Sequence, residues 1–488
     1  MKFHKRALLL VSLVFIFSVH SQEPTTKKVE ATKPVVASGP FLVKPYLQLG
    51  TVARPNALSL LWHSTDGKGN WRVEYLVGTS KTWRTAALTQ TKVAPPGTEL
   101  HWVHRAALVD LEPGETFKYA ISRANQGLFS AESTAPKRPD QAQRFVVFGD
   151  CGADTPEQRA IAYRTYLESP DYVMITGDIV YGKGLISEYR DKFWPIYNAS
   201  DASESAGAPL LRSTLFVAAP GNHDIASRDL EKTPDGLAYF FYWDQPLNGP
   251  TDKEGTALVA PVTGPPATKQ AFLDAAGPAF PRMANFSFEI GNAHWTILDA
   301  NASVDWTDAK LQKWVADDLA AAKNSGWRFV NFHQPGFNSS KSHFDEQYMR
   351  ILAPVFEKGK VDMVFNGHVH NYQRSYPMHF LPEAAAPLEP DGKAKKTRRL
   401  GGKWTLDMTF DGKRDTSPEG VIYIVTGAGG QQLYNAEQQD QPETWQEFTF
   451  KHISKVHTLS VVDIAGSTMT LRQIMPNGEE ADRFAIKK

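Results

Sequence analysis

Five apolar segments in the middle of the chain each end in a polar residue that can bind a metal. They are RFVVFGD, DYVMITGD, TLFVAAPGNHD, RFVNFHQP and VDMVFNGHVH, and NAHWTILDAN and VIYIVTGAGG are built in the same way. Segments that are apolar on both faces are typical of strands covered by helices, and TPEQRAIAYRTYLESP, after the first segment, has a helical pattern. This region is therefore constrained to layers of β-sheet and α-helix.

The first part of the chain has a different pattern. Between residues 39 and 136, short alternating runs such as ALSLLWHS, WRVEYLVG and TFKYAISR are separated by turn residues, which is typical of a β-sandwich. Because 488 residues exceed what one core usually holds, we expect a sandwich over 39–136 and a second domain over 140–488. A polar insertion at about 381–419 and a Gly/Pro-rich stretch at about 226–281 are expected to be long loops, and the second is a candidate cover for the site.

The first 38 residues are expected to lie outside both domains. Residues 1–21 have a basic start and an apolar run shorter than the ~20 residues of a membrane-spanning helix. This layout predicts a secretory signal peptide, with an uncleaved anchor as the alternative. Residues 22–38, rich in Pro, Thr and Lys, predict a disordered linker. The single cysteine, Cys151, excludes an internal disulfide, so we expect a secreted or periplasmic bacterial protein with no stable membrane span after signal cleavage.

Charge and composition exclude two further classes. The 53 basic and 53 acidic residues balance, which gives no electrostatic reason to expect a nucleic-acid partner. With 42% hydrophobic and 22% charged residues, the chain is not mainly disordered. The oligomeric state is not specified by these features.

The polar residues at the predicted strand ends form an ordered set. Taken singly, a Gly-Asp after a strand is usually a turn, and a lone histidine or tyrosine is usually a packing residue. Five strand ends that carry Asp, Asp, Asn, His and His-x-His in this order are very unlikely by chance. Because strand carboxyl ends gather at one place in an α/β sheet, we expect these residues to converge. They are Asp150, Asp178, Tyr181, Asn222, His223, Asp224, His333, His368 and His370.

The motifs GDCG, GDIVY, GNH, VNFH and GHVH resemble, in order, the five motifs of the purple acid phosphatases within the calcineurin-like metallophosphoesterases. The resemblance covers about residues 144–374. In addition, LEPGETFKYAI is similar to a corner of a fibronectin type III-like domain, which matches the usual amino-terminal domain of that family. The implied fold class is α+β multidomain, with an N-terminal all-β sandwich followed by a four-layer α/β/β/α metallophosphoesterase domain.

The resemblance also implies two metal sites that share one carboxylate. The first site would use Asp150, Asp178, Tyr181 and His370, and the second Asp178, Asn222, His333 and His368, with Asp178 bridging. The first set is rich in anionic oxygen, whereas the second is mainly neutral nitrogen and amide oxygen. Since hard anionic oxygens favour a small, highly charged ion, these residues predict Fe(III) in the first site and divalent Zn, Mn or Fe in the second.

The implied function is a secreted binuclear acid phosphatase that hydrolyses small-molecule phosphomonoesters, with metal-bound hydroxide attacking in line at phosphorus. His223 and His343 are the predicted catalytic residues, which would neutralise phosphate charge and protonate the leaving group. A phosphodiesterase or nucleotidase with the same centre is the alternative in chemistry. A non-catalytic surface binding module that keeps the domain as a scaffold is the alternative in class.

Three residues near the motifs have roles that the sequence leaves open. Asp224 could orient His223 or cap the next turn, and Arg374 could make a structural ion pair or touch substrate. Cys151, inside GDCG, could be an extra soft neighbour of the metals, although we expect a buried inert thiol.

Overall fold

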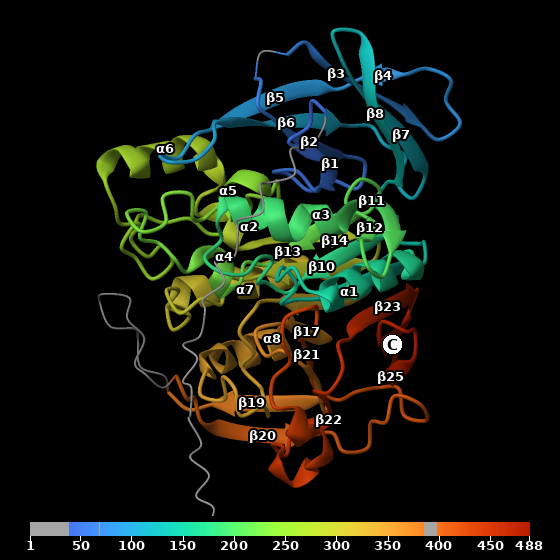
Figure 1. Ribbon diagram of the computed structural model, residues 1–488. Helices are drawn as coiled ribbons and strands as arrows, with labels where there is room; N and C mark the ends of the chain where they lie inside the picture. The colour runs from blue at the N-terminus through green and yellow to red at the C-terminus, as the bar shows by residue number, and fades with distance from the viewer. Residues whose placement is uncertain (1–38, 68, 385–397) are drawn as a thin grey trace, which may run out of the picture. The chain divides into compact units, whose positions relative to one another are not determined.

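Residues 39–67, 69–384 and 398–488 are described by a computed structural model (Figure 1). Gly39–Lys488 form one compact unit, so the predicted division near residues 136–140 stays a prediction. The predicted signal peptide 1–21 and linker 22–38 lie outside the described residues, as does the part of the predicted insertion at 385–397. No helix in the described ranges has both the length and the apolarity needed to cross a membrane.

The alternation of apolar and polar residues between positions 39 and 136 produces two four-stranded antiparallel sheets. In β3 (Trp71–Val77) every second residue is buried, so one face of the strand points into the sandwich. The first sheet has the order β1 (Val43–Gln48), β2 (Leu58–Ser64), β6 (His101–Leu108), β5 (Ala87–Val93). The second has the order β4 (Arg84–Thr85), β3, β7 (Thr116–Arg123), β8 (Gln126–Thr134). The predicted N-terminal all-β region is confirmed.

Two larger mixed sheets form most of the rest of the fold, with the parallel strands at one side of the six-stranded sheet and at the centre of the seven-stranded sheet. The six-stranded sheet has the order β13 (Leu215–Ala218), β10 (Tyr172–Ile175), β9 (Gln143–Phe148), β23 (Leu459–Ala465), β24 (Thr468–Ile474), β25 (Glu480–Lys487). The seven-stranded sheet has the order β14 (Phe286–Ile290), β15 (Ala293–Ile297), β16 (Trp327–Asn331), β17 (Met363–Asn366), β21 (Ile422–Thr426), β18 (Tyr372–Ser375), β22 (Thr449–Ile453).

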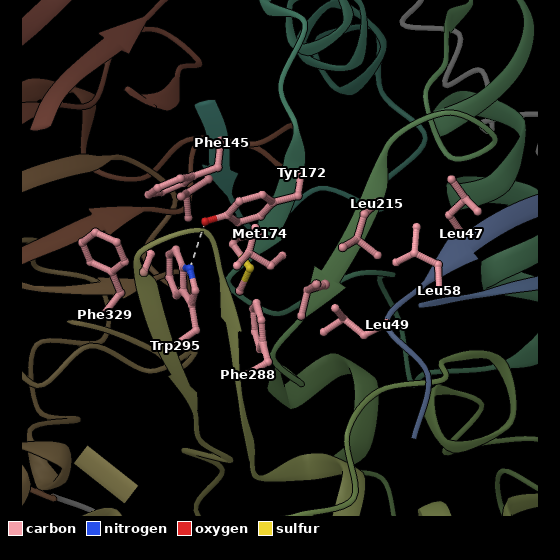
Figure 2. Close-up of a cluster of buried hydrophobic side chains, with 14 of the residues drawn as sticks. Leu47, Leu49, Leu58, Phe145, Tyr172, Met174, Leu215, Phe288, Trp295 and Phe329 are labelled. Atoms are coloured by element: carbon pink, nitrogen blue, oxygen red, sulfur yellow. Dashed lines mark hydrogen bonds between the residues drawn. The ribbon is translucent and has the colours of Figure 1, made fainter. Parts of the chain in front are cut away.

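An aromatic core joins the inner faces of these two sheets (Figure 2). The ring of Phe145, on β9, packs edge-on against Trp295, on β15, with 5.2 Å between centroids. The indole N–H of Trp295 donates to the Tyr172 hydroxyl at 3.0 Å, which satisfies a polar atom inside an otherwise apolar layer. This core holds the parallel strands of both sheets against one another.

Helices cover the outer faces and complete four layers. Helix α1 (Pro156–Glu168) begins where Thr155 accepts a hydrogen bond from the Gln158 N–H, with proline in the first turn, and it packs on the six-stranded sheet. Helices α7 (Ala309–Ala321) and α8 (Ala353–Lys358) pack on the seven-stranded sheet. The predicted α/β/β/α arrangement is confirmed.

The stretch at 226–281 contains more regular structure than its Gly/Pro content predicted. It includes α5 (Tyr239–Tyr242) and α6 (Pro266–Ala276). The four aromatic residues of α5 are buried, and the Tyr242 carbonyl accepts a hydrogen bond from the Tyr46 hydroxyl of β1 at 2.8 Å. Burial of these aromatic rings stabilises an otherwise irregular stretch, which thereby joins the sandwich to the α/β region.

Short elements complete the described chain. At the predicted insertion, β19 (Met378–Pro382), which overlaps its start, pairs with β20 (Gly402–Leu406), inside it, as an antiparallel ribbon. The other short elements are α2 (Ile186–Glu188), the π-helical turn Tyr189–Phe193, α3 (Trp194–Tyr197), β11 (Asn198–Ser203), β12 (Gly207–Pro209), α4 (Asn222–Ile225), and the 3-10 turns Gly277–Ala279, Arg282–Ala284, Tyr348–Leu352, Ala436–Asp440 and Pro442–Thr444.

Candidate metal centre

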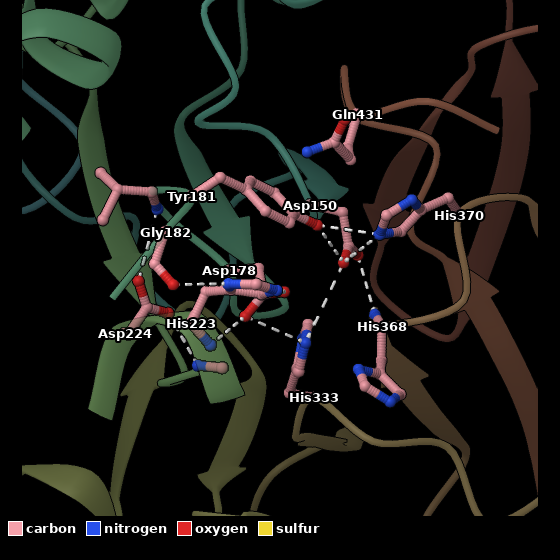
Figure 3. Close-up of polar contacts among 12 residues, drawn as sticks. Asp150, Asp178, Tyr181, Gly182, His223, Asp224, His333, His368, His370 and Gln431 are labelled. Atoms are coloured by element: carbon pink, nitrogen blue, oxygen red, sulfur yellow. Dashed lines mark hydrogen bonds and ion pairs between the residues drawn. The ribbon is translucent and has the colours of Figure 1, made fainter. Parts of the chain in front are cut away.

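The carboxyl ends of five strands from both large sheets bring the predicted residues together (Figure 3). The six-stranded sheet contributes through the loops after β9, β10 and β13, and the seven-stranded sheet through the loops after β16 and β17. All seven predicted metal ligands lie in this cluster, which consists of Asp150, Asp178, Tyr181, Asn222, His333, His368 and His370. Their assignment as ligands stays a prediction.

Asp150, Tyr181 and His370 form one tight group. The Tyr181 hydroxyl donates to Asp150 Oδ1 at 2.9 Å and also lies 2.9 Å from His370 Nε2. Asp150 Oδ1 and His370 Nε2 are themselves 3.4 Å apart, and Asp150 is fully buried. Two oxygens and one nitrogen therefore point at a common position.

Asp178 leads from this group to a second one. Its Oδ1 lies 3.2 Å from His333 Nε2, and one ligand atom each from Asp178, His333 and His368 lie within 4.8 Å of one another. The atoms Asn222 Oδ1, His333 Nε2 and His368 Nε2 are buried and form no hydrogen bond of good geometry within the described chain, although Asp178 Oδ1 and Glu346 Oε2 each lie 3.2 Å from one of the two histidine nitrogens. Buried polar atoms are normally hydrogen-bonded, so three such atoms without a well-formed hydrogen bond, beside buried carboxylates, fit the ligands of a cation.

Backbone carbonyls fix which nitrogen of two histidines faces the cluster. His333 Nδ1 donates to the Thr176 carbonyl at 2.8 Å, and His370 Nδ1 donates to the Gln432 carbonyl at 2.7 Å. Because a carbonyl can only accept, Nδ1 carries the proton in both rings and Nε2 is directed into the cluster. Metal-binding histidines are typically held in this way.

The loops that carry these residues have a demanding backbone. Asp150, Asp178 and His368 have φ of 58°, 49° and 67°, in the left-handed region that side chains other than glycine seldom adopt. At Gly221, a Cβ atom would lie 2.1 Å from Asp178 Oδ1, so only glycine allows the two loops to approach. Strain of this kind is typical of functional sites.

Buried carboxylates dominate the electrostatics of the cluster. Burial alone would raise the pKa of Asp178, but the charge and hydrogen bond of His333 lower that pKa below its usual range. Burial opposes a charged His333, yet the carboxylates of Asp178 and Asp150 raise the pKa of His333 to about 9. Burial, together with the same carboxylates, raises the pKa of Tyr181 well above its ordinary value. The cluster therefore favours cations.

The two predicted catalytic histidines border the cluster and are partly exposed. His223 Nδ1 donates to the Gly182 carbonyl at 2.9 Å, and His223 Nε2 lies 3.9 Å from Asp178 Oδ2. The ring centroid of His343 lies 3.9 Å from that of His368. Both imidazoles thus stand beside predicted ligands and reach solvent.

Two neighbours of the cluster were not predicted from the sequence. Glu346 Oε1 lies 2.7 Å from His343 Nδ1, and Glu346 Oε2 lies 3.2 Å from His368 Nε2. Tyr434 stacks on His370 with 4.0 Å between ring centroids. The three-residue spacing of His343 and Glu346 in SHFDE was a usable signal, whereas nothing in the sequence around Tyr434 pointed to the site.

The contacts of Asp224, Cys151 and Arg374 indicate a structural role for each. Asp224 accepts hydrogen bonds from the backbone N–H groups of Gly221 and Ile179 at 2.7 and 3.1 Å, so it caps two ligand-bearing loops. Cys151 is fully buried, and this burial raises the pKa of its thiol well above the ordinary value, as expected for an inert cysteine. Arg374 forms a bidentate pair with Asp482, at 2.7 and 3.0 Å, and is structural.

The Arg374 pair gives a prediction about stability. Asp482→Ala should lower the free energy of unfolding by about 3 kcal/mol, because it leaves a buried guanidinium without its partner. Burial opposes ionisation of Asp482, but hydrogen bonds and charge from Arg374 lower its pKa. The contribution should therefore be present above about pH 4 and be lost as the pH falls further. Urea unfolding at several pH values measures both effects.

Glu480→Ala, on the same strand, is the matched control for this prediction. Glu480 pairs with the exposed Arg483 at 3.2 Å and lies 3.7 Å from Arg472, which keeps its 3.0 Å pair with Glu168, so the loss should be below about 1 kcal/mol. Equal losses of stability in the two variants would contradict a structural role for the buried pair.

Comparison with known proteins agrees with this geometry. Residues 143–372 match the family of calcineurin-like phosphoesterases. The chain is 24% identical over 298 residues to purple acid phosphatase 23 of Arabidopsis thaliana, covering 56% of this chain and 57% of that protein. It is 26% identical over 285 residues to a phosphoenolpyruvate phosphatase of Allium cepa, covering 56% and 51%. The chain thus spans about half the length of these curated relatives.

The fold is shared with a purple acid phosphatase from seeds of yellow lupin (Lupinus luteus). The TM-score is 0.60 at 17% sequence identity, covering 91% of this chain and 74% of the lupin chain. The strand-end motifs and the two facing sheets agree with the match of residues 143–372 to the calcineurin-like phosphoesterases, and the similar proteins include purple acid phosphatases.

Proposed function

We propose that the protein is a metal-dependent phosphoric monoester hydrolase with a binuclear centre. The observation that carries the proposal is the convergence of seven oxygen and nitrogen donors from five strand ends, with Asp178 between the two groups. Asp150, Tyr181 and His370 would hold the first metal together with Asp178. The second metal would be held by the buried atoms Asn222 Oδ1, His333 Nε2 and His368 Nε2, again with Asp178. When bound, the two cations would neutralise phosphoryl charge and acidify a water molecule.

The oxygen-rich first group supports a trivalent ion such as Fe(III). The nitrogen-rich second group supports a divalent ion, namely Zn, Mn or Fe. Tyr181 is the residue that separates this proposal from one with two identical divalent ions, because a phenolate ligand favours a strong Lewis acid.

The protein's own side chains would manage the phosphate and its leaving group. The Gly182 carbonyl holds the proton on His223 Nδ1, so that Nε2 faces the position beside Asp178. Likewise, the Glu346 carboxylate, 2.7 Å from His343 Nδ1, holds a proton on that nitrogen. A protonated Nε2 on either ring could neutralise a phosphoryl oxygen or give its proton to the departing alkoxide.

Replacing either histidine should lower kcat without removing the bound metals. His223→Asn and His343→Asn should each lower kcat by about 10²-fold, the usual range for general acid–base catalysis. His379→Asn is the matched control, because His379 makes a similar 3.0 Å contact with Glu357 but is exposed on β19. Steady-state kinetics and metal analysis of the three variants check this. Unchanged kcat in the first two would contradict their catalytic role.

One comparison of substrates tests the proposed reaction. Metal-loaded protein should hydrolyse p-nitrophenyl phosphate with a kcat/KM about 10²-fold or more above that for bis(p-nitrophenyl) phosphate, since a second ester group must be accommodated in the diester. Preference for the diester would favour the phosphodiesterase alternative. Failure to hydrolyse any phosphate ester would favour the non-catalytic one.

A further inference from the structure

A cleft of about 640 Å³ lies directly beside the predicted catalytic histidine. His343 and Glu346 form one wall of it, and Glu346 also contacts His368 in the metal centre. A phosphoryl group at the centre would therefore have its ester oxygen within reach of the cleft. This volume is within the range of sites that bind a whole small molecule, and it is far larger than a phosphate group needs.

The charges that line the cleft cancel one another. Lys341 Nζ lies 2.9 Å from Glu437 Oε1, and Arg399 Nε lies 2.6 Å from Asp345 Oδ1. Glu346 adds a further carboxylate at the end nearest the metal centre. Among the described residues that line the cleft, each basic side chain is thus paired with a carboxylate. A second phosphate group would meet no unpaired cation here.

The cleft does, however, offer groups that fit a neutral polar molecule. Gln438 is buried, and its side-chain amide accepts a hydrogen bond from the Lys341 N–H and donates one to the Ser339 carbonyl. These bonds fix its position in the lining of the cleft. By contrast, no hydrogen bond of the Gln446 side-chain amide occurs within the described part of the chain. The Phe344 ring, 5.7 Å from the Arg399 guanidinium, supplies an apolar face. Hydrogen-bonding groups beside one aromatic face suit a hydroxyl-rich ring.

We propose that this cleft binds the leaving group of the substrate, and that this group is a neutral, hydroxyl-rich alcohol of the sugar or nucleoside type. The inference rests on the proposed phosphatase function and specifies the substrate class of that site. A leaving group that carries its own phosphate is disfavoured, because it would meet the carboxylate of Glu346 and no basic side chain that lacks a carboxylate partner.

Matched pairs of substrates test the charge of the leaving group. Glucose 6-phosphate is compared with glucose 1,6-bisphosphate, and AMP with ADP, using the metal-loaded protein. In each pair the extra phosphate should raise KM by roughly fivefold or more, because the cleft presents the Glu346 carboxylate and no basic side chain that lacks a carboxylate partner. The higher kcat/KM of glucose 6-phosphate and AMP shows whether the cleft prefers a sugar or a nucleoside as the leaving group. The p-nitrophenyl ester provides the reference rate.

Two variants test the cleft directly. Asp345→Asn frees Arg399, and Glu437→Gln frees Lys341, so each should lower the KM for ADP and for the bisphosphate by about threefold or more. For each variant, the change in kcat/KM for p-nitrophenyl phosphate, whose leaving group carries no phosphate, should be smaller than the change for ADP. Asp317→Asn, which frees Lys313 on α7 outside the cleft, is the matched control and should change neither value.

The outcomes separate the two proposals. Equal KM values within each pair, or variants that respond like Asp317→Asn, would overturn the assignment of the cleft while p-nitrophenyl phosphate hydrolysis still supports the phosphatase. Loss of hydrolysis of every ester in the wild-type protein would overturn the phosphatase, and the assignment of the cleft with it.

Discussion

Asp178→Asn should lower kcat/KM for p-nitrophenyl phosphate by at least roughly 10³-fold and reduce the metal content of the protein. Asparagine keeps the shape of the side chain but removes the negative charge and one coordinating oxygen. Asp178 is the proposed shared ligand, so the substitution should lower the metal affinity of both sites together. Loss of a ligand that serves only one metal would lower the affinity of that site alone. Elemental analysis of the purified variant and steady-state kinetics measure the two effects.

Asp154→Asn is the matched control for this substitution. Asp154 also has a left-handed backbone, with φ of 60°, and follows Asp150 by four residues, but it is half exposed and pairs with Arg159. Activity and metal content of this variant should stay within about twofold of the wild type. Thermal unfolding of both variants separates loss of metal from loss of fold. An Asp178→Asn protein that keeps two metals and most of its activity would contradict the shared-ligand assignment.

The layers of the fold could be predicted because the signals are local. FVVF and YVMI are apolar at every position, which requires strands buried on both faces, and both lie in strands of the six-stranded sheet. The convergence of Asp150 and Asp178 then follows from parallel strands whose carboxyl ends share one edge.

The supporting residues could not be predicted, because they depend on how distant loops meet. Gln432 contributes a backbone carbonyl, and any residue type could supply it. Tyr434 stacks on His370 from a loop after β21 that carries no motif. The burial of α5 depends on its contact with β1, almost 200 residues earlier, and therefore on tertiary structure rather than on local Gly and Pro content.

Tyr181→Phe should remove visible absorption from the metal-loaded protein and weaken retention of the trivalent ion by about 100-fold, on the order expected when a ligand is lost. Phenolate bound to Fe(III) absorbs visible light by charge transfer, whereas Zn(II), with a filled d shell, has no such transition. Phenylalanine preserves the ring that packs 4.6 Å from His223, so the change is confined to the hydroxyl that touches Asp150 and His370. A visible spectrum and metal analysis before and after dialysis against a chelator measure the effect.

Tyr434→Phe provides the matched control, since Tyr434 also lies against His370 but through its ring face. This variant should keep the visible band and the iron content of the wild type, because the Tyr434 hydroxyl makes no hydrogen bond to a predicted ligand among the described residues. Loss of the band in Tyr434→Phe as well would assign it to the surroundings of His370 rather than to a Tyr181 phenolate. A colourless wild-type protein with two zinc or two manganese ions per chain would contradict the trivalent–divalent pair. It would leave the hydrolase intact, because charge neutralisation at phosphorus needs two cations of either kind.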